Sequence, residues 1–162
     1  MINLKDGESS NLGEIQCDIS SDFFKENQFR LTNANAKTFI LILANKTPKS
    51  LLSGGLIDLD KVLKKYNRAE FHHIYPRAYL KEEKYSDDDI NCLANFCFLS
   101  TSENKKIGRK KPSEYIELMP NGDELSDIRT STFCPEDAFD DNYRKFIDKR
   151  AELLANFAKA LI

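Results

Sequence analysis

The stretches Phe71-His72-His73-Ile74-Tyr75-Pro76 and Leu93-Ala94-Asn95-Phe96-Cys97-Phe98-Leu99 decide the fold of this chain. Both are rich in aromatic and branched residues, and a proline ends the first, as is typical of β-strands. We expect one strand over 70–75 and a second within 90–99. If the two strands pair as a hairpin, the histidines approach the helix that the Ser100-Thr101-Ser102 cluster begins.

Helices are expected on both sides of this region. Phe39, Ile40 and Leu43 recur at helical spacing, although such an apolar run also suits a buried strand. The segment 81–89 carries five acidic residues and is expected to be a solvated loop, not a metal site at Asp87, Asp88 and Asp89. The fold class is therefore α+β and mostly helical. The predicted helices cover 21–29 with Ser21 as N-cap, 36–45, 58 or 60 to 66, 112–119 and 141–161, and the segment 1–20 is expected to be irregular.

Length and composition limit the class of protein. The chain has 162 residues with 24 Lys and Arg against 26 Asp and Glu, for a net charge of −2. This length suits one domain, and the aromatic content excludes a mainly disordered chain. The longest apolar run, 39–44, is far too short to cross a bilayer, and no basic-then-apolar leader opens the sequence, so we expect a cytoplasmic protein. Binding to a polyanion would require a local basic patch.

Four cysteines are present, at positions 17, 92, 97 and 134. The spacing of Cys92 and Cys97 is not the CxxC of a zinc knuckle, and no second close pair exists. We therefore expect reduced cysteines in the apolar core.

The two histidines of the chain are adjacent, which is the main chemical signal. Successive residues of a strand point to opposite faces, so one imidazole can bind a divalent cation together with the amide oxygen of Asn104 while the other faces a water molecule. Imidazole accepts a proton near neutral pH, and a metal ion stabilises the charge that develops during phosphodiester cleavage. A basic cluster then follows, either as phosphate-binding residues or as a solvated helix end: Lys105, Lys106, Arg109, Lys110 and Lys111.

These motifs together resemble the HNH (ββα-metal) endonuclease motif. The run 71–76, the Leu-Ala-Asn-Phe segment at 93–96 and Asn104-Lys105 occur in the order of that motif. The closer likeness is to the C-terminal nuclease domain of GmrSD-type modification-dependent restriction and phage-defence proteins, to which the Lys-Pro-Ser-Glu-Tyr stretch 111–115 and the Phe146-Ile147-x-x-Arg150 ending are also similar. The resemblance is strong over 70–115 and loose before it.

The resemblance implies a role for each matching residue. His73 matches the general base and His72 the first metal ligand, where Asp is common in other branches of the family. Asn104 matches the ligand at the start of the helix. Asn95 matches the central Asn, which is grouped with the catalytic residues and usually braces the loop by hydrogen bonds. Arg77 is a further candidate for contact with nucleic acid. The implied domain is a single HNH domain over 1–162 with a ββα-metal core at 68–116 and a packing helix at 141–161.

The implied activity is metal-dependent hydrolysis of DNA with Mg²⁺ or Mn²⁺. A neutral imidazole and an amide form a softer and weaker ligand set for Mg²⁺ than a carboxylate would, so Zn²⁺ or Ni²⁺ could also occupy the site in a crystal. Full-length members of the family usually carry an N-terminal nucleotide-hydrolysing domain, so such a domain or subunit is a possible partner. Two alternatives remain: a nucleic-acid-binding module that does not cut, and a protein-interaction module that uses the long C-terminal helix. The preferred DNA and the oligomeric state do not follow from the sequence.

Overall fold

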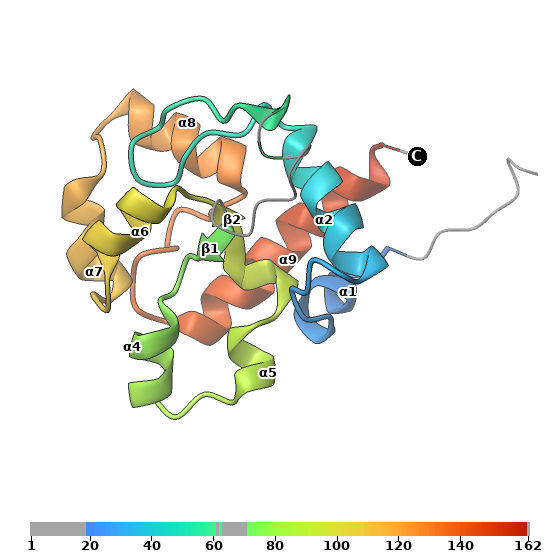
Figure 1. The fold of residues 1–162 in the computed structure, drawn as a ribbon, viewed down its shortest axis with the longest axis horizontal. Helices are drawn as coiled ribbons and strands as arrows, with labels where there is room; N and C mark the ends of the chain where they lie inside the picture. Colours follow the sequence, from blue (N-terminus) through green and yellow to red (C-terminus); the bar gives the residue numbers. More distant parts are fainter. Residues whose placement is uncertain (1–18, 61, 63–70, 162) are drawn as a thin grey trace, which may run out of the picture.

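The computed structural model describes residues 19–60, 62 and 71–161. This part of the chain is mostly helical and contains a small two-stranded antiparallel sheet, so the α+β class is confirmed (Figure 1). The elements are α1 (Ser21–Glu26), α2 (Ala34–Ala44), β1 (Phe71–His73), α4 (Arg77–Glu82), α5 (Asp87–Ile90), the 3₁₀ helix η3 (Leu93–Asn95), β2 (Phe96–Phe98), α6 (Thr101–Ile107), α7 (Pro112–Tyr115), the 3₁₀ helix η4 (Ile116–Leu118), α8 (Asp123–Thr132) and α9 (Tyr143–Lys159).

The strands β1 and β2 pair over three residues each. Phe71 lies opposite Phe98, His72 opposite Cys97 and His73 opposite Phe96. Pro76 becomes the N-cap of α4 and lacks the backbone N–H that a ladder needs, which explains why the chain leaves β1 soon after the histidines.

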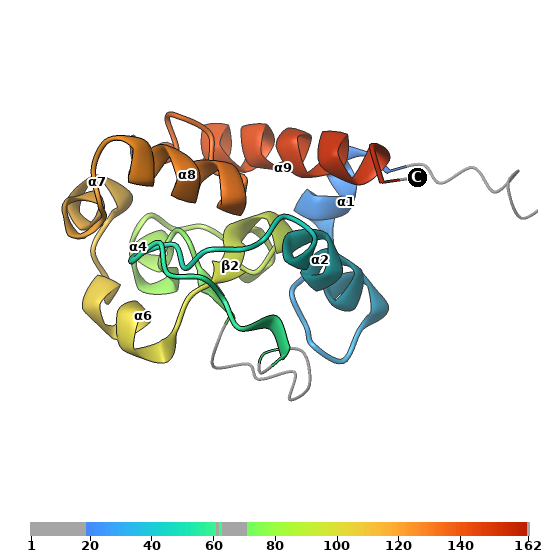
Figure 2. The ribbon, with the colours of Figure 1, turned by 90° about the horizontal axis from the view of Figure 1, so that it is seen from above.

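The sheet lies between two groups of helices. In the view from above, α8 and α9 run along one side of the molecule, α6 lies on the opposite side, and β2 and α4 lie between them (Figure 2). The last helix carries an apolar stripe, most of which faces inward: Tyr143, Phe146 and Leu154 are buried, whereas Leu161, just past the end of the helix, is exposed. The stripe therefore packs against the same chain, which leaves little of it for a partner.

Local signals explain several helix starts. The hydroxyl of Ser100 accepts the backbone N–H of Glu103, and the Glu103 carboxylate accepts the N–H of Ser100, which forms a capping box at the start of α6. Asn33 and Asn142 cap α2 and α9 more simply, since their side-chain oxygens accept the backbone N–H groups of Ala36 and Lys145. The serine cluster at 100–102 thus starts a helix as predicted.

The expected loop at 81–89 is wrong. Helices α4 and α5 occupy most of it, because Arg77 to Glu82 are good helix formers and Ser86 caps the acidic first turn of α5 by accepting the N–H of Asp89. The second strand is also shorter than the expected 90–99. Ile90 ends α5, and η3 comes before β2.

Other expectations need smaller corrections. Helix α1 has Ser20 as its N-cap, not Ser21, and ends at Glu26, and the predicted helix 112–119 divides into α7 and η4. Helix α8 has no counterpart among the predicted elements. Most of 58–66, the start of the expected 68–116 core, Cys17 and the segment 1–18 lie outside the described residues.

Cys92, Cys97 and Cys134 are buried and form no disulfide, as expected. Burial raises the pKa of each of these thiols, which keeps them protonated at neutral pH. No helix among the described residues has the length and apolar character that a membrane span requires.

Candidate functional site

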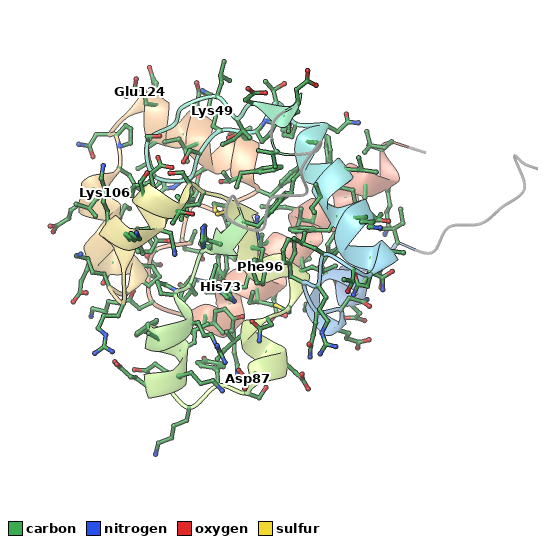
Figure 3. All side chains as sticks on the ribbon, in the orientation of Figure 1. Lys49, His73, Asp87, Phe96, Lys106 and Glu124 are labelled. Carbon is green, nitrogen blue, oxygen red and sulfur yellow. The ribbon has the colours of Figure 1, made fainter. Side chains whose placement is uncertain are left out.

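The two histidines lie on β1 at the edge of a cleft. The cleft has a volume of about 680 Å³ and receives residues from separate parts of the chain. The imidazole of His73 packs against Phe96 on β2, with 4.2 Å between the ring centroids (Figure 3). The residues that line the cleft are Phe29, Arg30, Leu31, Thr32, Phe71, His72, His73, Arg77, Asn91 and Phe96.

Asn91 fixes the orientation of the His73 ring. Its Nδ2 donates to the backbone oxygen of Asp87 at 2.7 Å, and its Oδ1 lies 3.1 Å from Nε2 of His73. Because the Asp87 carbonyl can only accept, the amide nitrogen must face it and the amide oxygen must face the imidazole. Nε2 of His73 therefore carries a proton. In the neutral ring the lone pair is then on Nδ1, which makes Nδ1 the basic nitrogen.

Asn95 holds the backbone just after the histidines. Its side chain is fully buried; Oδ1 accepts the N–H of Tyr75 at 2.9 Å, and Nδ2 donates to the oxygens of Tyr75 at 3.2 Å and Ile90 at 3.0 Å. These bonds connect the end of β1 with α5. Asn95 does not line the cleft, so its position supports the bracing role and gives no support for direct contact with a substrate.

Asn104 lies in the middle of α6, which starts directly after β2. It is partly exposed and does not belong to the lining of the His72 cleft. Its helix is fixed by Glu103, whose carboxylate accepts the hydroxyl protons of Ser50 and Ser100, both at 2.7 Å. Partial burial disfavours the charged carboxylate, but the hydroxyl donors outweigh it and lower the pKa of Glu103.

The predicted metal ligands are one imidazole and one amide, and neither belongs to a cluster of acidic, histidine or cysteine ligands among the described residues. No cluster of three or more His, Cys, Asp or Glu side chains suitable for a metal occurs within 19–60, 62 and 71–161. His72 and Asn104 offer one imidazole nitrogen and one amide oxygen. In its chemistry this pair fits a cation that takes its other ligands from water and from a phosphate group. Asn104 is not among the residues that line the cleft of His72, so a metal ion shared by these two residues stays a prediction.

The predicted basic cluster lies apart from the cleft. All five of its residues are exposed, and none lines the cleft. Figure 3 shows Lys106 well away from His73, on the outer side of α6. Arg109 lies 3.6 Å from Glu82 and Lys111 lies 3.4 Å from Asp141, so acids already compensate part of the positive charge. A contact of this cluster with nucleic acid stays a prediction.

Arg77 does line the cleft. Its Nη2 lies 3.1 Å from Oδ1 of Asp87, whose other oxygen lies 3.0 Å from Nζ of Lys81. Hydrogen bonds from Lys81 and Arg77 lower the pKa of the Asp87 carboxyl. Asp87 thus acts as a partner for two cations and starts a helix.

Sequence reasoning missed five residues of the cleft, namely Phe29, Arg30, Leu31, Thr32 and Asn91. None of them belongs to a motif quoted above, and the first four come about forty positions before the histidines. No local pattern signals them, because they reach the cleft only through tertiary folding. His72, His73 and Arg77 are the predicted residues that line the cleft.

Comparison with known proteins gives little further information. No family model matches the chain, and no solved structure matches it. An uncharacterized protein of Methanocaldococcus jannaschii is similar, with 26% identity over 116 residues. The match covers 55% of this chain and 20% of the archaeal protein, so the chain spans about a fifth of the length of that relative.

Proposed function

We propose that this chain is a metal-dependent endonuclease domain that hydrolyses phosphodiester bonds of DNA, with His73 as the general base. The observation that carries this proposal is the neighbourhood of His73. The ring lies on a strand that pairs with β2, α6 follows β2 directly, and Asn91 holds Nε2 so that the lone pair of the neutral ring is on Nδ1. We interpret β1, β2 and α6 as a ββα-metal core.

In this mechanism Nδ1 of His73 takes a proton from the attacking water. The Asn91 amide holds the ring throughout and stabilises the imidazolium that results, because the Oδ1 acceptor remains paired with Nε2–H. Asn95 keeps the strand end in place from below the cleft. Arg77 offers a guanidinium to the phosphate backbone.

His72 and Asn104 are the residues that would hold Mg²⁺ or Mn²⁺. The ion, when bound, supplies a Lewis acid for the phosphate oxygens and the leaving oxygen. Because both protein ligands are neutral, we expect weak metal binding without DNA.

The first test is the nicking of supercoiled plasmid DNA in the presence of Mn²⁺ or Mg²⁺. The His73→Ala variant should cut at least about 100-fold more slowly, because a positioned general base contributes on that order. Lys159→Ala, a change at an exposed residue at the end of α9, is the matched control and should cut as the wild type does. Equal cutting by His73→Ala and the wild type would reject His73 as the base.

The second test addresses the metal. Asn104→Ala should weaken Mn²⁺ binding in titration calorimetry and raise the metal concentration at which cutting is half-maximal. Since Asn104 is partly exposed, the variant should keep the stability of the wild type. An unchanged metal titration would remove Asn104 from the ligand set.

The competing function is a nucleic-acid-binding module without cutting. It predicts DNA binding that weakens steeply with salt and no product with any divalent metal. We also propose, from the family resemblance, that a nucleotide-hydrolysing domain or subunit regulates cutting in a restriction or phage-defence system, and that the protein works in the cytoplasm.

A further inference from the structure

One wall of the cleft comes from the connection between α1 and α2, at residues 27–33. We name this segment the strap. Backbone bonds hold it against the end of α5: Phe29 donates to the Asn91 oxygen at 2.8 Å, and Leu93 donates to the Asn27 oxygen at 2.9 Å. The backbone of Asn91, whose side chain contacts His73, therefore also holds the strap.

An aromatic contact fixes the strap from the inside. The ring of Phe29 stacks on Phe96 with centroids 4.2 Å apart and planes 17° apart, and Phe96 in turn contacts His73. Offset aromatic pairs of this kind add to the stability of the packing. The wall is thus preformed next to the candidate base.

Arg30 brings a positive charge to this wall. Its Nη2 donates to Oε1 of Gln28 at 2.8 Å, and no carboxylate of the described residues lies within 4.0 Å of its guanidinium. The amide nitrogen of Gln28 donates to Asp88, which fixes the amide so that its oxygen faces Arg30. Arg77, in contrast, is paired directly with Asp87. The neutral side chain of Gln28 therefore orients Arg30 without reducing its charge, whereas the carboxylate of Asp87 partly neutralises Arg77.

We propose that Arg30 binds a phosphate group of the nucleic-acid backbone and that the strap forms the second wall of the substrate groove. Figures 1 and 2 show α4, which carries Arg77, and the α1–α2 connection on different sides of the strand pair. Arg30 and Arg77 line the same cleft as the two imidazoles. The planar fork of arginine suits bidentate binding of a phosphate. This inference rests on the proposed function and assigns the main phosphate contact to Arg30 instead of the 105–111 cluster.

The test is the binding of a fluorescently labelled DNA duplex, measured by anisotropy in EDTA over a series of salt concentrations. Arg30→Gln should weaken binding about 3- to 10-fold and lower the slope of log K against log salt by about 0.9, the value of one lost phosphate contact. Arg30→Lys should keep the slope and recover only part of the affinity, because it keeps the charge and loses the fork. Lys159→Gln also removes one exposed positive charge, and its effects on the affinity and on the slope should both be smaller than those of Arg30→Gln.

The outcomes separate this inference from the proposed function. If Arg30→Gln and Lys159→Gln bind DNA equally well, the role of Arg30 is wrong even when the wild type cuts DNA. If the wild type binds DNA and Arg30→Gln lowers the slope, but no metal supports cutting, Arg30 keeps its role and only the nuclease function is rejected. If the wild type does not bind DNA at any salt concentration, both proposals are wrong.

Discussion

A single buried amide, Asn95, connects three backbone groups that no other side chain could serve equally well. It needs one acceptor for the N–H of Tyr75 and two donors for the oxygens of Tyr75 and Ile90. Aspartate offers no donor at neutral pH, and alanine leaves all three groups without a partner in a buried position. The free-energy cost of leaving these buried backbone groups unpaired therefore favours asparagine at position 95.

Replacement of Asn95 should therefore destabilise the fold. We expect Asn95→Ala to lower the free energy of unfolding by about 2 kcal/mol and Asn95→Asp by about 3 kcal/mol, because aspartate also places a carboxylate against two carbonyl oxygens. Urea denaturation followed by circular dichroism measures both values. Asn104→Ala, at a partly exposed position, should stay within about 0.5 kcal/mol of the wild type. A similarly small change for Asn95→Asp would mean that the three bonds contribute little.

Asn91 should control the tautomer of His73. In the wild type, the neutral ring should hold its proton on Nε2, because Asn91 Oδ1 requires a donor there. Asn91→Leu removes that acceptor, so the ring should redistribute between its two tautomers. Nitrogen-15 NMR of the imidazoles, without metal and at a pH where the rings are neutral, measures this directly. His72 serves as the internal reference, and an unchanged His73 spectrum would contradict the role of Asn91.

For single residues, the sequence predicts which residues belong to the motif but not which side chains they contact in the fold. The order of His72, His73, Asn95 and Asn104 came from a family resemblance, and the structure places the histidines at the cleft and Asn95 beneath it. Arg30 could not be predicted, since only the folding of the strap brings it to the cleft.

Among the elements, α9 does more than cover the core. Arg150 on this helix is fully buried and donates to the backbone oxygen of Thr132 through Nε at 3.2 Å and Nη2 at 3.0 Å, and to that of Ala94 through Nη1 at 2.5 Å. It thus joins α9 to the end of α8 and to η3, directly beside Asn95. Burial lowers the pKa of the guanidinium, which nevertheless keeps its charge at neutral pH.

The loss of this junction should destabilise the protein. Arg150→Met removes the buried charge but leaves the oxygens of Thr132 and Ala94 without donors, so we expect the free energy of unfolding to fall by about 3 kcal/mol. Thermal and urea denaturation measure the change. Lys159→Met on the same helix is exposed and should have a small effect. If Arg150→Met is as stable as the wild type, the free energy gained by no longer burying a charge offsets the free energy lost with the three hydrogen bonds.

Elements with a strong apolar pattern were predicted, and polar elements were not. Helix α9 has a clear stripe and was expected at nearly its observed bounds. Helix α8 reads Asp-Glu-Leu-Ser-Asp-Ile-Arg-Thr-Ser-Thr, and its buried residues are Ile128, Ser131 and Thr132. Two of these three are polar, so hydrophobic periodicity cannot reveal the helix.

For the molecule as a whole, we expect the ion pairs of Asp137 to contribute to the response to acid. Hydrogen bonds from Lys145 and Lys149 lower the pKa of the Asp137 carboxyl from an ordinary value of 3.8 to about 2. This carboxylate ties the 133–141 connection to α9. Because the folded state holds the lower pKa, the pair contributes stability above the pKa of the unfolded chain and loses it as pH falls through the folded value.

We therefore expect the stability of the wild type to decrease as the pH is lowered from about 4 to about 2. In Asp137→Asn the decrease over this range should be smaller, although the variant should start from a lower stability at neutral pH. Melting temperatures measured across the range test this. Parallel curves for the two proteins would show that other carboxylates dominate acid unfolding.

The buried thiols make the protein its own reporter of transient opening. A disulfide reagent such as Ellman's can reach Cys92, Cys97 and Cys134 only when the surrounding core separates, because all three are buried. In a Cys17→Ser background, the rate at which each thiol is modified would therefore measure how often its surroundings open. The three regions reported are the end of α5, β2 and the turn after α8. A DNA duplex seated in the cleft should slow modification at the first two and leave Cys134 unaffected.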